Sequence, residues 1–121
     1  MPMSEPMTIT PLDAKLSVSP QVRIDDLARL HAAGFRCVIN NRPDGEAVDQ
    51  PASAQLAVEA ARLGLDYHHI PVVPGHVEDA DALTFAEVLA SANGPALAFC
   101  RSGARSTSLW KRGRELLGQR V

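Results

Sequence analysis

Apolar and polar positions alternate with two different periods along the chain, and their order predicts a fold. Short apolar or alternating runs predict strands at residues 15–20, 35–40, 66–73 and 95–100. Apolar residues at helical spacing predict helices at residues 23–34, 53–64, 79–94 and 106–118. Strands and helices therefore alternate as βαβαβαβα. This order is typical of an α/β fold with a mostly parallel sheet flanked by helices, in a single domain.

Cap and terminal residues set the expected limits of this domain. Ser53 is the predicted N-cap of the second helix, and Asp79 or Asp81 is the predicted cap of the third. Residues 1–11 carry no apolar period and are expected to form a flexible N-terminus. The domain is then expected to cover residues 12–121.

The composition of the chain argues against several classes of binding partner and cellular location. A net charge of −2 and a pI near 6.0 argue against a nucleic-acid-binding surface. No apolar run approaches the roughly 20 residues that span a membrane, and the N-terminus does not resemble a secretory signal. The two cysteines, Cys37 and Cys100, cannot form a disulfide framework, so we expect a cytoplasmic protein with free thiols. No metal or other cofactor is expected.

The strongest chemical signal is the stretch Cys100-Arg101-Ser102-Gly103-Ala104-Arg105-Ser106, between the last strand and the last helix. A strand, a glycine turn and a helix start form a cradle of backbone N–H groups, which favours anions and thiolates. Two arginines, Arg101 and Arg105, flank the turn, and an arginine can clasp an oxyanion with two donors. These residues predict a nucleophilic Cys100 in an anion-binding loop. Cys37, within an apolar strand, is expected to be a core residue instead.

The loop also resembles known families. "FCRSGARS" resembles the active-site loop of single-domain rhodaneses, in which four residues separate the cysteine from the arginine, as they do here. The segments "VINNRPDGE", "YHHIPVVPG" and "GPALAFCRSGARSTSLW", in that order, resemble the phosphatase-like domain of the beta-lactamase-hydrolase-like proteins, from about Leu12 to about Leu117. That family is similar in fold to dual-specificity cysteine phosphatases but has the shorter loop.

The resemblance implies Cys100 as the nucleophile, Arg105 as the anion-clasping residue and residues 101–106 as the cradle. In that family the domain is sometimes fused to a sulfur dioxygenase. For this chain we expect any such dioxygenase to be a separate protein.

Two reactions compete for this loop. A phosphatase needs a general acid, and the matching position of dual-specificity phosphatases falls near Val73-Pro74, where no residue can donate a proton. Sulfur transfer from thiosulfate or a persulfide to Cys100, and onward to a thiol acceptor, needs no such acid. A loop one residue shorter also forms a narrower cradle, which suits a single sulfur better than a tetrahedral phosphate. Loop length and the missing acid therefore predict a sulfurtransferase first, and a phosphatase acting on phosphate esters second. A non-catalytic anion-binding module is a third possibility.

Some residues outside the loop are candidates for the pocket. Arg42 is expected at the same sheet edge as Cys100, where it would attract anions, although a solvated turn arginine fits equally well. Asp44 and His76 are candidate proton donors, as are three acids further along: Glu78, Asp79 and Asp81. A Pro-Asp-Gly turn explains Asp44 equally well.

Overall fold

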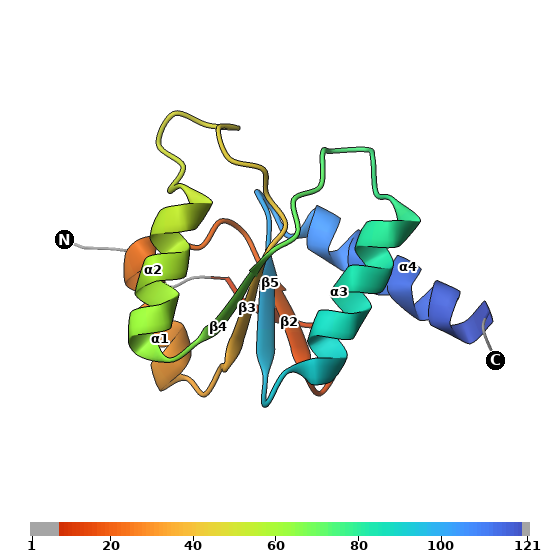
Figure 1. Cartoon of the computed structure of the whole chain (residues 1–121), viewed down its shortest axis with the longest axis horizontal. Coiled ribbons are helices and arrows are strands. Elements are labelled where there is room, and N and C mark those ends of the chain that lie inside the picture. The colour runs from red at the N-terminus through yellow and green to blue at the C-terminus, as the bar shows by residue number, and fades with distance from the viewer. Residues whose placement is uncertain (1–7, 120–121) are drawn as a thin grey trace.

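A computed structural model describes residues 8–119 and contains one five-stranded sheet between two pairs of helices (Figure 1). The elements in chain order are β1 (Thr10–Pro11), β2 (Leu16–Ser19), α1 (Ile24–Ala32), β3 (Cys37–Asn40), α2 (Ser53–Leu63), β4 (Asp66–His69), α3 (Asp79–Ser91), β5 (Ala96–Phe99) and α4 (Ala104–Gln119). Within residues 8–119 no helix is long and apolar enough to cross a membrane.

The strand order places the last strand at the centre of the sheet. The order is β1-β2-β5-β3-β4, and all pairs are parallel except β1 with β2. Ala96 of β5 pairs with Leu16 of β2 on one side and with Cys37 of β3 on the other. The expected mostly parallel α/β sheet is confirmed, and β5 delivers its following loop to the middle of the carboxyl edge.

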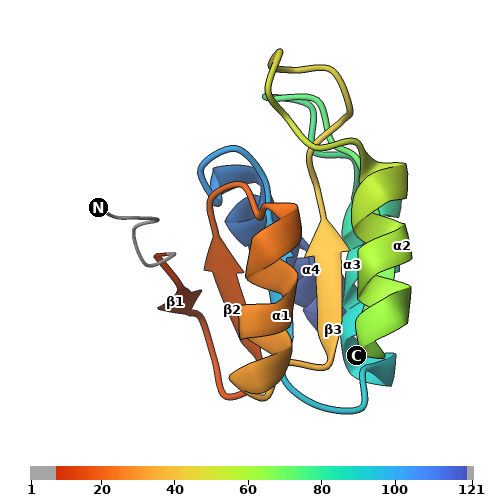
Figure 2. The same cartoon turned by 90° about the vertical axis from the view of Figure 1, so that its left-hand side faces the viewer.

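Two apolar layers hold the helices on the sheet. Helices α1 and α2 cover one face, and α3 and α4 cover the other (Figures 1 and 2). Side chains of β5 alternate between the layers, because successive residues of a strand point to opposite faces. Leu97 and Phe99 pack in the α1–α2 layer, whereas Ala96 and Ala98 pack in the α3–α4 layer.

Helix α4 lies close to α3 at a single glycine. A Cβ placed on Gly113 would be 3.0 Å from the carbonyl oxygen of Ala82 and 3.4 Å from the Cβ of Ala86. Only glycine permits this approach of two helix backbones without a shift of one helix. The position of α4, which begins at the cysteine loop, therefore depends on α3.

Several element boundaries differ from those expected. Thr10 and Pro11, placed in the flexible N-terminus, pair with β2, whereas residues 1–7 lie outside the described part of the chain. Ser53 is not an N-cap: Ala52 holds that position, and the Asp44 carboxylate accepts the Ser53 N–H at 2.8 Å. The predicted caps of α3 are also wrong, since Glu78 is its N-cap.

Cys37 is a core residue, as expected. It is 1% exposed in the α3–α4 layer, and burial raises the pKa of its thiol to about 11. Because Cys37 pairs with Ala96, Cys100 lies four residues further along the strand direction, or about 13 Å. A disulfide needs Cα atoms within about 7 Å, so these two thiols cannot meet in this fold.

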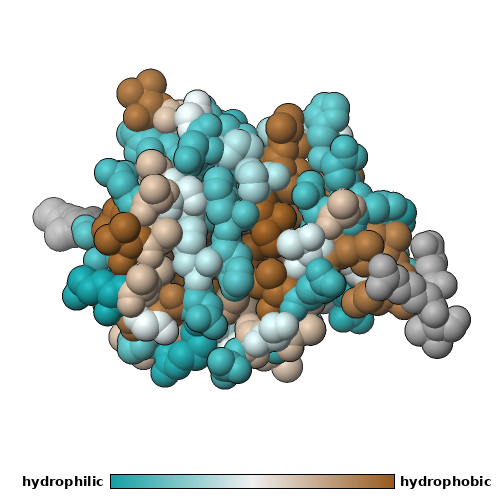
Figure 3. Space-filling view, in the orientation of Figure 1, coloured by the Kyte–Doolittle hydropathy of each residue, from teal (hydrophilic) through white to brown (hydrophobic). Residues whose placement is uncertain are grey.

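Two loops rise above the carboxyl edge of the sheet, one after β3 and one after β4 (Figure 1). Both carry hydrophobic side chains near their tips (Figure 3), and Val48 and Val73 are exposed there. The loop from β5 to α4 begins at the same edge, so three segments distant in sequence converge beside Cys100.

Candidate active site

Cys100 is the first residue after the central strand. The carbonyl oxygen of Phe99, the last residue of β5, accepts the backbone N–H of Asn41 at 2.8 Å, which ties β5 to the end of β3. The chain then turns at Gly103, whose φ of +97° is left-handed. A Cβ there would lie 3.4 Å from the carbonyl oxygen of Ser19, so glycine suits both the turn and the contact with β2.

The Cys100 thiol is surrounded by backbone donors. Its residue is 1% exposed, and the Gly103 N–H donates to Sγ at 3.0 Å. Burial alone would raise the pKa of the thiol, but the backbone N–H groups of four loop residues outweigh it and lower the pKa. In order of effect these are Ser106, Ser102, Arg105 and Gly103. The N–H groups of the loop therefore converge on Sγ, an arrangement that favours a thiolate.

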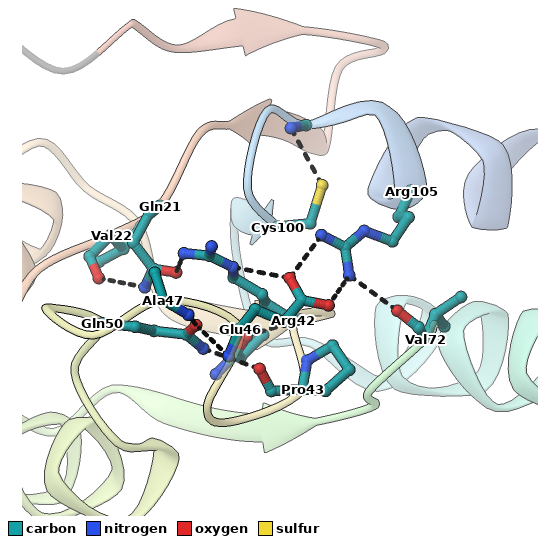
Figure 4. A network of polar contacts seen from close by, with 12 residues as sticks. Gln21, Val22, Arg42, Pro43, Glu46, Ala47, Gln50, Val72, Cys100 and Arg105 are labelled. Carbon is teal, nitrogen blue, oxygen red and sulfur yellow. Dashed lines mark hydrogen bonds and ion pairs between the residues drawn. The ribbon is translucent and has the colours of Figure 1, made fainter. Parts of the chain in front are cut away.

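Arg105 lies beside Cys100 and is held by a carboxylate from another loop (Figure 4). Its Nη1 donates to Glu46 Oε2 at 2.8 Å and to the Val72 carbonyl at 2.9 Å, and its Nη2 donates to Glu46 Oε1 at 2.9 Å. A guanidinium has five N–H donors in fixed positions. These contacts use three, and the two left are the Nε–H and the second Nη2–H, which form one bidentate edge for an oxyanion.

Glu46 belongs to the candidate site, and the sequence analysis did not single it out. Its two hydrogen bonds from Arg105, reinforced by one from Arg42, lower the pKa of its carboxyl to about 2. The signal that would have found it is an acidic residue in a turn at the same sheet edge as Arg105. The two residues are 59 positions apart in the sequence, so only the strand order shows that they meet.

Arg42 supports Glu46 rather than standing at the mouth of the pocket. It is 6% exposed, its Nε donates to Glu46 Oε1 at 2.9 Å, and its Nη1 donates to Gln21 at 3.0 Å. Its expected attraction for anions remains a prediction, and any such effect would pass through Glu46 and Arg105.

Asn41 joins the parts of the site from beneath. Its Oδ1 accepts the hydroxyl of fully buried Ser106 at 2.8 Å, and its Nδ2 donates to the Ile70 carbonyl at 2.9 Å. Its own carbonyl accepts the Val72 N–H at 3.0 Å. Ser106 supplies an N–H to the thiolate and Val72 supplies a carbonyl to Arg105, so Asn41 braces both reactive groups.

A cavity of about 600 Å³ opens beside the loop. Its walls come from the loop itself, from helix α4 and from the segment after β4: Pro74, Gly75, Val77, Arg101, Ser102, Ala104, Arg105, Ser108 and Arg112. The structure thus brings together the predicted Arg101, Ser102, Ala104 and Arg105, with Gly103 and Ser106 beneath them.

The candidate proton donors take other places. The Asp44 carboxylate accepts the N–H of Ser53 in the first turn of α2. His76 lies exposed in the loop after β4, where its backbone N–H donates to the Val73 carbonyl at 2.9 Å. Asp79 pairs with Arg112 through two oxygens. Among the described residues that line the cavity there is no carboxylate and no histidine.

Comparison with known proteins agrees with this geometry. The model of the family described as "Beta-lactamase hydrolase-like protein, phosphatase-like domain" matches residues 8–116. The beta-lactamase hydrolase-like protein of Agrobacterium fabrum (strain C58) is 37% identical over 108 residues, which cover 89% of this chain and 25% of that protein. The protein of the same description from Xylella fastidiosa (strain Temecula1) is 34% identical over 104 residues, covering 86% of this chain and 24% of that protein. The chain therefore spans about a quarter of the length of the curated relatives it matches.

Solved structures place the fold among cysteine phosphatases of the dual-specificity type. A candidate phosphatase from Neisseria meningitidis Z2491 has a TM-score of 0.78 and 36% sequence identity, and the match covers 84% of this chain and 72% of that chain. With the family match, the order of the three motifs and the geometry of the cysteine loop, the conclusion is direct. This chain belongs to the phosphatase-like domain family of the beta-lactamase hydrolase-like proteins.

Proposed function

We propose that this chain is a cysteine-dependent phosphatase that acts on phosphate monoesters. The observation that carries the proposal is a thiol with a lowered pKa beside a guanidinium that Glu46 holds, with one bidentate edge that neither Glu46 nor Val72 uses. The family and its phosphatase neighbours support this reading above sulfur transfer. The order that loop length and the missing acid predicted is thereby reversed.

In the first step the Cys100 thiolate attacks phosphorus, and the bond between phosphorus and the leaving oxygen breaks. The phosphoryl group is then on Sγ, while Arg105 and the loop N–H groups hold its oxygens. In the second step water attacks the phosphocysteine, inorganic phosphate leaves and the thiolate returns. Preorganised donors supply the stabilisation, since they are in place before the reaction.

The lining of the cavity sets an expectation about the leaving group. Because no described lining residue is an acid or a histidine, the leaving oxygen takes its proton from water. The rate of the first step should therefore fall steeply as the pKa of the leaving alcohol rises. Aryl phosphates should react faster than alkyl phosphates.

Sulfur transfer remains the second candidate, because the short loop brings its backbone N–H groups close to the sulfur atom of Cys100. The Gly103 N–H lies 3.0 Å from Sγ, in a loop with four residues between Cys100 and Arg105. Such a cradle suits a terminal sulfur. Thiosulfate would pass its outer sulfur to the thiolate and release sulfite, and a thiol acceptor would take that sulfur from the persulfide.

One experiment separates the candidates. Phosphate release from phenyl phosphate would be assayed for the wild type, for Cys100→Ser and for the matched control Cys37→Ser. The mass of each intact protein would also be measured by mass spectrometry after exposure to thiosulfate. The proposal expects phosphate release in the wild type and in Cys37→Ser only. A one-sulfur adduct that depends on Cys100, without phosphate release, would establish the sulfurtransferase instead. If neither signal depends on Cys100, the anion-binding module is the remaining function.

A further inference from the structure

The cavity beside the cysteine loop is lined by more arginines than a single phosphate requires. Three of its nine lining residues are arginines, Arg101, Arg105 and Arg112, and none is acidic. Its volume of about 600 Å³ lies within the roughly 300–1,000 Å³ of small-molecule sites and leaves room beyond the reacting group. Arg105 faces Cys100, so the other two arginines line space beyond the reacting phosphate.

Arg101 is the available cation of this cavity. Among residues 8–119 its guanidinium has no hydrogen-bond or ion-pair partner, although it directly follows the nucleophile in the chain. Its donors are therefore free for a ligand. Arg105, by contrast, has most of its donors committed to Glu46 and Val72.

Arg112 extends the positive wall along helix α4. Arg105, Ser108 and Arg112 are spaced three and four residues apart, so they share one face of the helix. The two arginines are seven positions apart, which corresponds to about 10 Å along the helix axis. Asp79 holds Arg112 through Nε at 2.7 Å and Nη2 at 3.1 Å, while the Nη1 contact with Glu115 is long at 3.5 Å. Nη1 is the donor that a ligand can recruit.

We infer that the substrate carries a second anionic group, which Arg101 and Arg112 bind while its phosphate reacts at Cys100. This inference rests on the proposed function and names the class of its substrate: a compact molecule with two phosphates, or with a phosphate and another strong anion, within about 10 Å of each other. The apolar side chains of Pro74 and Val77 form the wall against which the carbon skeleton lies.

Binding is tested first without turnover. Cys100→Ser would be titrated by calorimetry, at physiological ionic strength, with 4-hydroxyphenyl phosphate and with 1,4-phenylene bisphosphate, which differ only in the second phosphate. We expect the bisphosphate to bind about tenfold more tightly or better, as one added charge-assisted hydrogen bond gives. Arg101→Gln in the same background should remove most of that preference. The control Lys111→Gln removes an equal charge from an exposed position on α4 outside the cavity lining, and should keep the preference.

Equal affinity for the two ligands in Cys100→Ser would overturn the inference. So would an Arg101→Gln variant that weakens both ligands by the same factor, because that result is a general charge effect. Asp79→Asn gives a test in the opposite direction: it frees Arg112 and should strengthen bisphosphate binding severalfold. Unchanged binding in that variant would remove Arg112 from the site.

Turnover separates this inference from the proposed function. If the wild type hydrolyses neither ligand while the bisphosphate preference of Cys100→Ser stands, the phosphatase proposal fails and the second anion site survives. If the wild type hydrolyses both ligands with equal kcat/KM, and Cys100→Ser binds them equally, the phosphatase proposal stands and the second anion site fails.

Discussion

Replacing Glu46 by glutamine should destabilise the protein in a way that depends on pH. Glutamine has the shape of a protonated glutamic acid, so the variant mimics loss of the Glu46 charge at constant volume. In the structure that carboxylate accepts two hydrogen bonds from Arg105 and one from Arg42. The substitution leaves two guanidinium groups, each 10% exposed or less at the side chain, without their anionic partner.

The magnitude follows from the pKa of Glu46. The pKa falls from 4.5 to about 2, and at about 1.4 kcal/mol per unit this corresponds to roughly 3 kcal/mol. The Glu46 side chain is 23% exposed, so screening by solvent reduces the expected value to about 2 kcal/mol. Since the pKa is depressed in the folded state, this stabilisation is complete above pH 4.5 and is lost as the pH falls towards 2. At pH 3 more than half of it should be gone.

Urea unfolding from pH 7 to pH 3, followed by the fluorescence of the single tryptophan, Trp110 on α4, measures this loss. The wild type should exceed Glu46→Gln in free energy of unfolding by about 2 kcal/mol at pH 7, and the two curves should converge on acidification. The matched control is Glu59→Gln, whose carboxylate pairs with Arg62 on the exposed face of α2. It should lie close to the wild type at every pH. Parallel curves for the wild type and Glu46→Gln would refute the reasoning.

Three further predictions concern the thiols and the packing of the site. In a titration followed by the ultraviolet absorbance of the thiolate, Cys100 should ionise below the usual pKa of 9.0 and Cys37 near 11. If Cys100→Ala shows the same single transition as the wild type, the cradle does not lower the pKa of Cys100. Asn41→Ala leaves buried polar groups unpaired, so it should lower the free energy of unfolding in urea by on the order of 2–4 kcal/mol and raise the thiol pKa of Cys100. A loss well under about 1 kcal/mol would contradict the role of Asn41 in holding the site together. Gly113→Ala should lower the free energy of unfolding, because overpacking costs about 1–3 kcal/mol and helix propensity returns only about 1 kcal/mol. The control Gly118→Ala, whose Cβ would have no neighbour within 4 Å, should raise the free energy of unfolding. A melting temperature that rises in both glycine variants would show that α3 yields to the added methyl group.

The parts of the site that lie close together in the sequence could be predicted from it. Cys100, Gly103 and Arg105 form one loop after an apolar strand, and local patterns suffice to place such a loop at the carboxyl edge of a parallel sheet. The core position of Cys37 follows equally from its apolar neighbours. In both cases the structure of the segment is determined mainly by residues close to it in the sequence.

The contacts that orient the reactive groups could not be predicted, because they depend on strand order. Glu46 meets Arg105 across 59 residues, and Asn41 meets Ser106 across 65. Both contacts arise because β5 lies beside β3, a fact that the order of elements along the chain does not reveal. The first turn of α2 also differs from the prediction, because the Ser53 N–H donates to the Asp44 carboxylate in the preceding loop and Ala52 holds the N-cap position.

The central place of β5 also determines when the protein can fold. Strands β2 and β3 pair with β5 and not with each other, so the halves β1–β2 and β3–β4 share no strand pairing until residues 96–99 are inserted between them. During synthesis, which proceeds from the N-terminus, Cys100 follows immediately after the strand that completes the sheet. Until then both inner strands expose unpaired edges of the kind that invite aggregation. Completion of the sheet and assembly of the thiolate cradle are therefore a single late event, and a nascent chain without β5 has neither.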